Sequence, residues 1–282
     1  MEANAKPNYG KKVFFVSQNK RLQQMLRKRL LTMEYEVYFL EDYRIVKNLI
    51  SESPDSILFI LPEKQLKLAG WKNFIKSINS DMYFSSTAIG LLLKGFTENQ
   101  IIEFTGGLKL EAGIITVNDD EEDSDEMFHE IVKTLDKLDA KGMRQYVRAS
   151  CLGDEKSQVY WLEGDRMHKL NIMDISSVGL ALLLPAKNYA QMAGIKEIPG
   201  AKITIKEKQE SIPLDIYTIK QAGQNYVIVA MFQKTVTTKT LELIRDYVSD
   251  MLLADQYRKI LNRPIDKIDY NTFVVESDDI FD

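Results

Sequence analysis

Short apolar runs alternate with stretches of helical spacing through the first half of the chain. Five runs have the length of strands, at residues 12–17, 36–40, 56–61, 88–93 and 113–117. Apolar residues at i, i+3 and i+4 predict helices between and after them, at residues 20–33, 43–51, 71–78, around 101 and, with Ser124 as cap, at 125–138. Strands that are apolar at every position indicate a parallel sheet covered on both faces. We therefore predict an α/β domain over residues 10–140.

The periodicity changes to that of antiparallel strands after residue 140. Six further runs lie at residues 158–162, 166–174, 178–184, 201–206, 213–219 and 226–232. Turn signals containing Gly164 and Gly223 separate two pairs of them. This many strands in so short a segment predicts a six-stranded closed β-barrel over residues 141–234.

Helical spacing returns over residues 235–263 and ends at Pro264. Asp255 and Arg258 interrupt a strict heptad, which favours a C-terminal helix packed on its own barrel over an oligomerisation helix. The acidic tail at residues 264–282 also carries aromatic residues. We expect this tail either to dock or to be loose.

Composition narrows the function classes. The chain has 282 residues, enough for two domains, and a formal net charge of −4, which argues against DNA as a partner. Its single cysteine, Cys151, allows no intrachain disulfide and favours a reducing compartment. Residues 1–12 lack the apolar segment of a signal peptide, and no apolar run is long enough to span a bilayer. We expect a cytoplasmic, soluble protein.

Five strand–helix repeats of this length resemble a response-regulator receiver, which has a flavodoxin-like fold. The resemblance lies in the pattern and not in the motifs. A receiver needs an acidic pair after its first strand, an aspartate after its third and a lysine after its fifth. Here residues 17–19 are Ser, Gln and Asn, residues 61–63 are Leu, Pro and Glu, and residues 118 and 119 are Asn and Asp. We predict a degenerate receiver-like domain that is not phosphorylated.

Two motifs carry the remaining chemistry. Arg144 and Arg148 form an R-x-x-x-R pair just before the first predicted barrel strand. Asp174, Ser176 and Gly179 form D-x-S-x-x-G between two apolar β runs. Each motif alone has an ordinary explanation, surface ion pairing for the arginines and a strand-end turn for the second motif. Together and in this order, they resemble the signature of PilZ domains, receptors for cyclic di-GMP (c-di-GMP).

The resemblance implies a binding site for c-di-GMP formed by Arg144, Arg148, Asp174, Ser176 and Gly179. Arginine can pair bidentately with phosphate or with guanine O6 and N7. A carboxylate can accept from guanine N1–H and N2–H₂, and a glycine lets backbone approach closely. Many family members bind a ligand dimer through another basic residue before the first arginine. Met143 stands there in this chain, which favours one ligand per site.

We find no catalytic or metal site. His129 and His168 are isolated, the acidic run at residues 119–126 lacks EF-hand spacing, and no nucleophile lies in a known motif. We therefore expect a c-di-GMP effector without a cofactor and without enzyme activity. The family implies a protein partner in motility or secretion machinery and an output in motility, adhesion or exopolysaccharide. The alternatives are a PilZ-like interaction module without nucleotide control, a phosphorylated response regulator, and an enzyme with an unrecognised site.

Overall fold

The computed structural model describes residues 10–117, 121–143 and 145–272, with side chains from residue 125 onward in the second of these ranges. Contacts divide the chain into two compact units. The described residues up to Gln145, together with those from Gln256 onward, form what we call the α/β unit. Residues Tyr146–Asp255 form the β unit. The α/β unit is thus assembled from two separate stretches of sequence.

The α/β unit contains a five-stranded parallel sheet. Its strands are β1 (Val13–Val16), β2 (Val37–Leu40), β3 (Ile57–Ile60), β4 (Ala88–Leu93) and β5 (Gly113–Thr116). They pair in the order β2-β1-β3-β4-β5, which is the order of flavodoxin-like sheets. Every residue of β1, β3 and β4 is buried, as the apolar runs predict. The predicted parallel sheet is confirmed.

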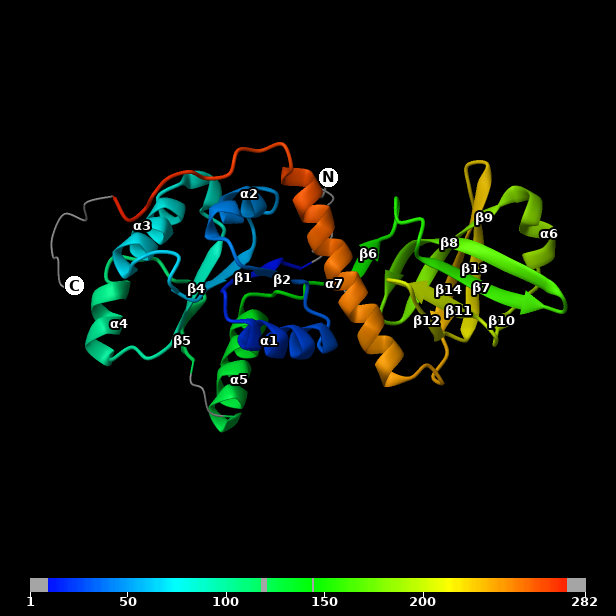
Figure 1. The fold of residues 1–282 in the computed structure, drawn as a ribbon, viewed down its shortest axis with the longest axis horizontal. Coiled ribbons are helices and arrows are strands. Elements are labelled where there is room, and N and C mark those ends of the chain that lie inside the picture. The colour runs from blue at the N-terminus through cyan, green and yellow to red at the C-terminus, as the bar shows by residue number, and fades with distance from the viewer. Residues whose placement is uncertain (1–9, 118–120, 144, 273–282) are drawn as a thin grey trace, which may run out of the picture. The chain divides into compact units, whose positions relative to one another are not determined.

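Helices cover both faces of this sheet. They are α1 (Lys20–Thr32), α2 (Val46–Ser51), α3 (Leu68–Asn79), α4 (Glu98–Thr105) and α5 (Glu121–Lys137), with 3₁₀ turns η1 (Tyr43–Ile45) and η2 (Met82–Phe84). Figure 1 shows α1 and α5 on one face and α2 and α3 on the other. Helix α5 begins at Glu121 rather than at the predicted Asp125, so Ser124 lies inside it. Acidic residues in a first helical turn interact favourably with the helix dipole, which accounts for the earlier start.

The β unit contains nine antiparallel strands. They are β6 (Arg148–Ser150), β7 (Gln158–Glu163), β8 (Arg166–Ser176), β9 (Gly179–Pro185), β10 (Glu197–Ile198), β11 (Lys202–Ile205), β12 (Lys208–Ser211), β13 (Leu214–Ala222) and β14 (Asn225–Phe232). They pair in the order β10-β13-β14-β9-β8-β7-β11-β12, and β6 pairs with β8. Both predicted hairpin turns are confirmed, with positive φ at Gly164 and Gly223.

The predicted closed barrel of six strands is wrong in its strand number and its closure. The sheet is a curled half-barrel, and no strand pair joins β10 to β12 among the residues that the structure describes. The strands missed in the sequence are β6, β10 and β12, which are only two to four residues long. A strand this short contains too few residues for an alternating pattern to be recognised.

Between β9 and β10 the chain forms the turn η3 (Ala186–Asn188) and the short helix α6 (Tyr189–Met192). The C-terminal helix α7 (Thr238–Ile260) follows β14 and contributes to the core of the β unit. Its residues Ile244, Tyr247 and Val248 are buried in a cluster with side chains from the sheet. This packing supports the interpretation of a helix that covers its own sheet. In the parts of the chain that the structure describes, no helix combines the length and the apolar character needed to cross a membrane.

Candidate ligand-binding site on the β unit

Strand β6 places Arg148 beside two of the predicted ligand-binding residues. In the antiparallel ladder between β6 and β8, Arg148 lies opposite Ser176, and Ser150 lies opposite Asp174. Because alternate residues of a strand share a face, these four side chains project from one face of the pair. Ala149 and Ile175 project from the other face into the buried core. The ladder thus fixes a polar face on which Arg148 is exposed.

Arg148 and Asp174 interact electrostatically across this ladder. Burial raises the pKa of Asp174 above its ordinary value, and the positive charge of Arg148 opposes this rise. The carboxylate therefore bears a desolvation penalty that a single diagonal arginine does not remove. A ligand that donates hydrogen bonds to this carboxylate would stabilise its charged form.

Replacing Asp174 with asparagine is expected to stabilise the ligand-free chain near neutral pH. Because the folded-state pKa exceeds the unfolded value of 3.8, the folded chain binds more protons than the unfolded chain just above that pH. The free energy of unfolding of the wild type therefore falls as pH rises through this window. The asparagine side chain does not titrate, so the variant does not show this fall. Urea unfolding at about pH 7 and about pH 3 measures the difference, which should vanish at the lower pH. A wild type more stable than the variant at neutral pH would show that pairing with Arg148 outweighs burial.

Ser176 is part of the turn between β8 and β9. Its hydroxyl donates to the carbonyl of Gly179 at 3.2 Å and accepts from the backbone N–H of Val178 at 3.4 Å. The side chain is 4% exposed. In this arrangement both functions of the hydroxyl are used locally, as in a strand-end turn. Ser176 therefore holds the backbone of the β8–β9 turn and presents little surface to a ligand.

Gly179 lies where β9 approaches β14 very closely. A Cβ atom at this position would lie 2.4 Å from the carbonyl oxygen of Ala230 and 3.2 Å from the Cα of Met231. No side chain larger than hydrogen fits without a shift of the backbone. From the sequence, we expected this glycine to let backbone approach closely. The structure shows close approach, and the approaching group is the neighbouring strand.

Two serines near the predicted site residues were missed by the sequence reasoning, one on this face and one in the β8–β9 turn. Ser150 lies opposite Asp174 in the ladder. The Ser177 side chain is 5% exposed, and its hydroxyl has no hydrogen-bond partner among the residues that the structure describes. Ser177 occupies a variable position inside D-x-S-x-x-G, so the motif gave no signal for it. A buried hydroxyl without a partner is unusual in folded proteins.

The structure describes Met143, Cys151 and His168, which the sequence analysis also singled out, but not Arg144. Arg144 lies outside the described residues, so its place in the site stays a prediction. Met143 is 78% exposed. Burial raises the pKa of Cys151 to about 11, so the thiol is a neutral, inert filler of the core. His168 is buried and stacks on Trp161, with ring centroids 4.9 Å apart.

Other chemistry is sparse in what the structure describes. No group of three potential metal ligands occurs among these residues. At the receiver-like positions, the Asn19 side chain caps α1 by accepting from the backbone N–H of Leu22 at 3.0 Å. Glu63 accepts a hydrogen bond from the backbone N–H of Gln18. These residues therefore have structural roles in helix capping and loop closure.

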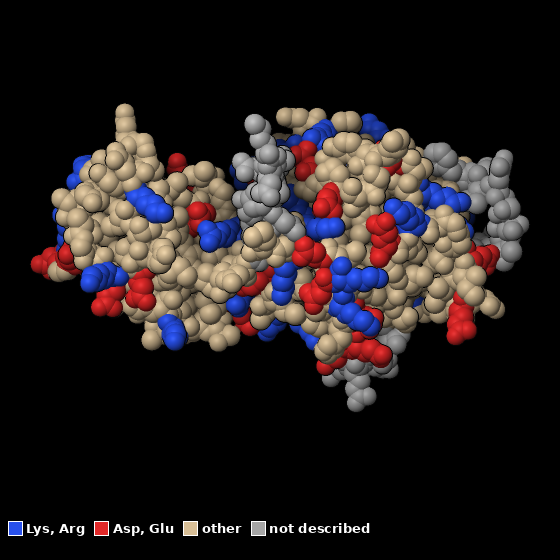
Figure 2. All heavy atoms as spheres, turned by 180° about the vertical axis from the view of Figure 1, so that it is seen from behind, with Lys and Arg blue, Asp and Glu red and all other residues tan. Residues whose placement is uncertain are grey.

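The charge distribution bears on nucleic-acid partners. Figure 2 shows lysine and arginine interspersed with aspartate and glutamate over the visible face of the α/β unit. Sequence-independent binding to nucleic acid depends on neutralising many phosphates with a continuous basic surface. The face seen in Figure 2 is of mixed sign. The expectation that DNA is not a partner stays a prediction.

No protein-family model matches the chain, and no curated protein sequence matches it. Solved structures are similar to it. One is K. pneumonia MrkH in complex with c-di-GMP, at 16% identity and a TM-score of 0.37, over 41% of this chain and 55% of that chain. Another is the Bacillus subtilis inhibitor of motility MotI (DgrA), at 16% identity and a TM-score of 0.29, over 43% of this chain and 53% of that chain. The chain thus spans little more than half the length of these two proteins.

A third similar structure is the PilZ domain of Escherichia coli YcgR with c-di-GMP. The identity is 14% and the TM-score 0.31, over 43% of this chain and 99% of that domain. The solved structures that the chain is similar to thus include c-di-GMP-binding proteins and a PilZ domain, which is the family that its two motifs resemble.

Proposed function

We propose that the chain is a c-di-GMP effector whose ligand binds on the polar face of β6 and β8. The observation that carries this proposal is the β6–β8 ladder, which sets an exposed arginine beside a half-buried carboxylate. An arginine fork complements a phosphate or the O6 and N7 edge of guanine. A carboxylate complements the N1–H and N2–H₂ edge of guanine, so one nucleotide satisfies both groups.

The predicted ligand set keeps its five members in this proposal, with different roles. Arg148 and Asp174 contact the ligand, and Arg144 reaches it from the segment before β6. Ser176 and Gly179 hold the β8–β9 turn and the β14 backbone in the arrangement described above. Ligand binding orders the arginine segment, and this population shift alters the arrangement of the domains or exposes a partner surface. The output that we propose is control of motility, adhesion or exopolysaccharide through a protein partner.

In this proposal the α/β unit is a degenerate receiver-like docking module. Its strand order is flavodoxin-like, while Asn19 and Glu63 serve local structure at positions where a receiver binds metal or accepts phosphate. A phosphorylation-driven mechanism would need an acyl-phosphate acceptor that the sequence does not supply at Leu61–Glu63.

One observation favours a second candidate, an interaction module without nucleotide control. Two members of D-x-S-x-x-G already have complete structural explanations. Ser176 serves the β8–β9 turn, and Gly179 makes room for β14. A fold that needs these residues for itself would retain the motif even without a ligand. Binding experiments therefore decide between the two candidates.

Isothermal titration with c-di-GMP tests the proposal. We expect saturable binding at a stoichiometry of one ligand per chain, because Met143 replaces the extra basic residue. Cyclic di-AMP should bind at least about tenfold more weakly, since adenine lacks the guanine O6 acceptor and the N1–H and N2–H₂ donors. A stoichiometry of two ligands per chain would contradict only the inference from Met143 and would leave the effector proposal intact. Absence of any heat or thermal shift with c-di-GMP would reject the effector and favour the interaction module.

A further inference from the structure

The segment after α7 forms an ordered part of the α/β unit. Residues 263–272, which we call the strap, run along α2 and α3. Its backbone is held by side chains of these helices. The Asn48 amide donates to the carbonyl of Pro264 at 3.0 Å, and the Asn73 amide donates to the carbonyl of Tyr270 at 3.1 Å. The sequence left open whether the tail docks or is loose, and the described tail residues 264–272 are docked.

Tyr270 anchors the strap by its ring. The side chain is 2% exposed and packs edge-on against Phe74, with centroids 5.3 Å apart, and against Tyr43 at 6.2 Å. Edge-to-face contacts of this kind stabilise aromatic clusters beyond the area that they bury. The α/β unit therefore supplies an aromatic pocket for one specific side chain.

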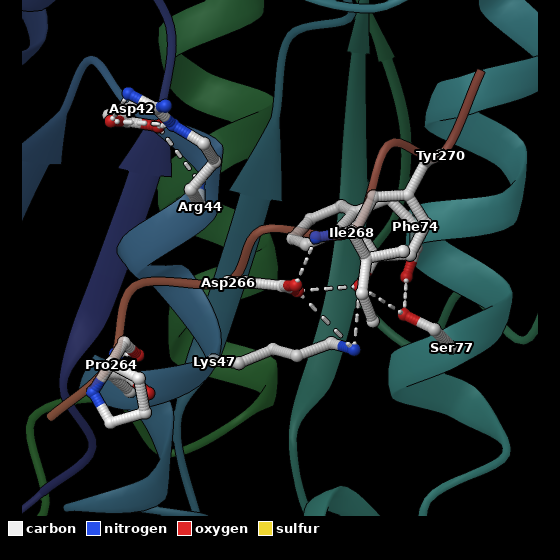
Figure 3. Close-up of polar contacts among 10 residues, drawn as sticks. Asp42, Arg44, Lys47, Phe74, Ser77, Pro264, Asp266, Ile268 and Tyr270 are labelled. Carbon is white, nitrogen blue, oxygen red and sulfur yellow. Dashed lines mark hydrogen bonds and ion pairs between the residues drawn. The ribbon is translucent and has the colours of Figure 1, made fainter. Parts of the chain in front are cut away.

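The hydroxyl of Tyr270 joins a polar network with Lys47, Ser77 and Asp266, which Figure 3 shows. It accepts from Lys47 Nζ at 2.8 Å and from Ser77 Oγ at 3.5 Å, and it donates to Asp266 Oδ2 at 2.7 Å. Asp266 also lies 3.9 Å from Lys47 Nζ. A buried hydroxyl is costly without partners, so this network selects tyrosine over phenylalanine at the anchor and an acid four residues before it.

Helix α3 has a notch for the next strap residue. Asn271 Oδ1 accepts from the backbone N–H of Lys67 at 2.9 Å, close to the start of the helix. A Cβ atom on Gly70 would lie 2.5 Å from that same oxygen. Gly70 is the third residue of α3, and its missing side chain leaves the space that the Asn271 side chain occupies. The surface thus recognises Asp266, Tyr270 and Asn271, spaced D-x-x-x-Y-N.

We infer that the α2–α3 surface is a peptide-recognition site for the D-x-x-x-Y-N pattern, and that the strap is its intramolecular occupant. The partner that this surface fits is the same segment of a second copy of the chain. The strap is covalently tethered, so its effective concentration at the surface is high and it excludes a free peptide. A copy whose own anchor is lost accepts the segment in trans.

Peptide binding to the full chain tests this inference. The probe is a fluorescently labelled peptide covering Asn262–Thr272, and the protein is the full chain with Tyr270→Ala. We expect saturable anisotropy changes with this variant and at least about tenfold weaker binding to the wild type, whose site is occupied. The same peptide with its tyrosine replaced by alanine should not bind. Equal binding to both proteins, or none to a folded Tyr270→Ala chain, would overturn the inference.

A second test measures the cleavage of the strap and needs no added peptide. Lys267 is an exposed trypsin site inside the strap, and docking should slow cleavage after it. Gly70→Ala should accelerate this cleavage modestly, because the new methyl group displaces the Asn271 side chain from its hydrogen bond with the Lys67 N–H and leaves the Tyr270 anchor in place. Gly200→Ala is the matched control, since a Cβ there meets no atom within 4 Å. Cleavage of the wild type as rapid as that of the Tyr270→Ala chain would show that the strap is not specifically bound.

Discussion

Replacing Arg148 with alanine is expected to weaken c-di-GMP binding about a hundredfold. A bidentate arginine contact with phosphate or guanine contributes roughly 1–3 kcal/mol, and each 1.4 kcal/mol is a factor of ten in affinity. We place Arg148 at the upper end because the ladder with β8 fixes its backbone next to Asp174. Loss of the guanidinium also leaves the Asp174 carboxylate without a compensating charge, which further disfavours an anionic ligand. Isothermal titration measures the change.

Two further variants make the Arg148 result specific. Arg166→Ala removes an exposed arginine at the opposite end of β8 and should change the affinity less than twofold or so. Arg148→Lys keeps the charge but loses the planar fork, so it should recover only part of the affinity. Equal effects of Arg148→Ala and Arg166→Ala would mean that general electrostatics, and not a site, attracts the ligand. Full affinity in Arg148→Ala would remove the β6–β8 face from the proposal.

The parallel sheet could be predicted from sequence because its signal is local. Each of β1, β3 and β4 is apolar at every position, and a buried strand of this kind is recognisable without knowledge of its neighbours. Two of the hairpin turns could also be predicted, since glycine is favoured where φ is positive, as at Gly164 and Gly223. These features are determined within a few residues of sequence.

The remaining parts of the fold depend on contacts that sequence periodicity does not report. Strand β12 has the sequence Lys-Gln-Glu-Ser and is a strand only because β11 pairs with it. The strap is similar, because Tyr270 is held by Lys47 from more than two hundred residues away. An acidic, aromatic tail gives no local indication of such a partner. The sequence therefore could not predict that the chain from Gln256 onward belongs to the α/β unit.

For the candidate site, the sequence predicted which residues lie together better than what each side chain does. The two motifs brought Arg148, Asp174 and Ser176 into one hypothesis, and the β6–β8 ladder places these three together. Their tasks differ, because the Ser176 hydroxyl is used by its own turn while Arg148 stays exposed. A motif records which residue types occur together. Only the hydrogen-bond geometry separates a side chain that stays exposed from one that holds the backbone.

Gly179→Ala is expected to destabilise the β unit by about 3 kcal/mol, even without ligand. The new methyl group would lie 2.4 Å from the Ala230 carbonyl oxygen, and a backbone atom in a paired strand cannot move aside as a flexible side chain can. Strands β9 and β14 must then separate at the Gly179–Met231 pair. Hydrogen exchange followed by mass spectrometry should show amide protection in β9 and β14 reduced by roughly a hundredfold.

The ligand-free comparison separates two explanations of this glycine. Gly200→Ala adds the same methyl group in the same unit where no atom lies within 4 Å, so protection there should stay within a few tenths of a kcal/mol of the wild type. If Gly179→Ala also kept wild-type protection, the glycine would be dispensable for packing, and a loss of c-di-GMP affinity in that variant would assign it to the ligand. If protection falls as expected, any loss of affinity in Gly179→Ala follows from strand separation. Gly179 would then act on the site only through the β9–β14 pairing, and direct contact with the ligand would be proposed for Arg148 and Asp174 alone among the described residues.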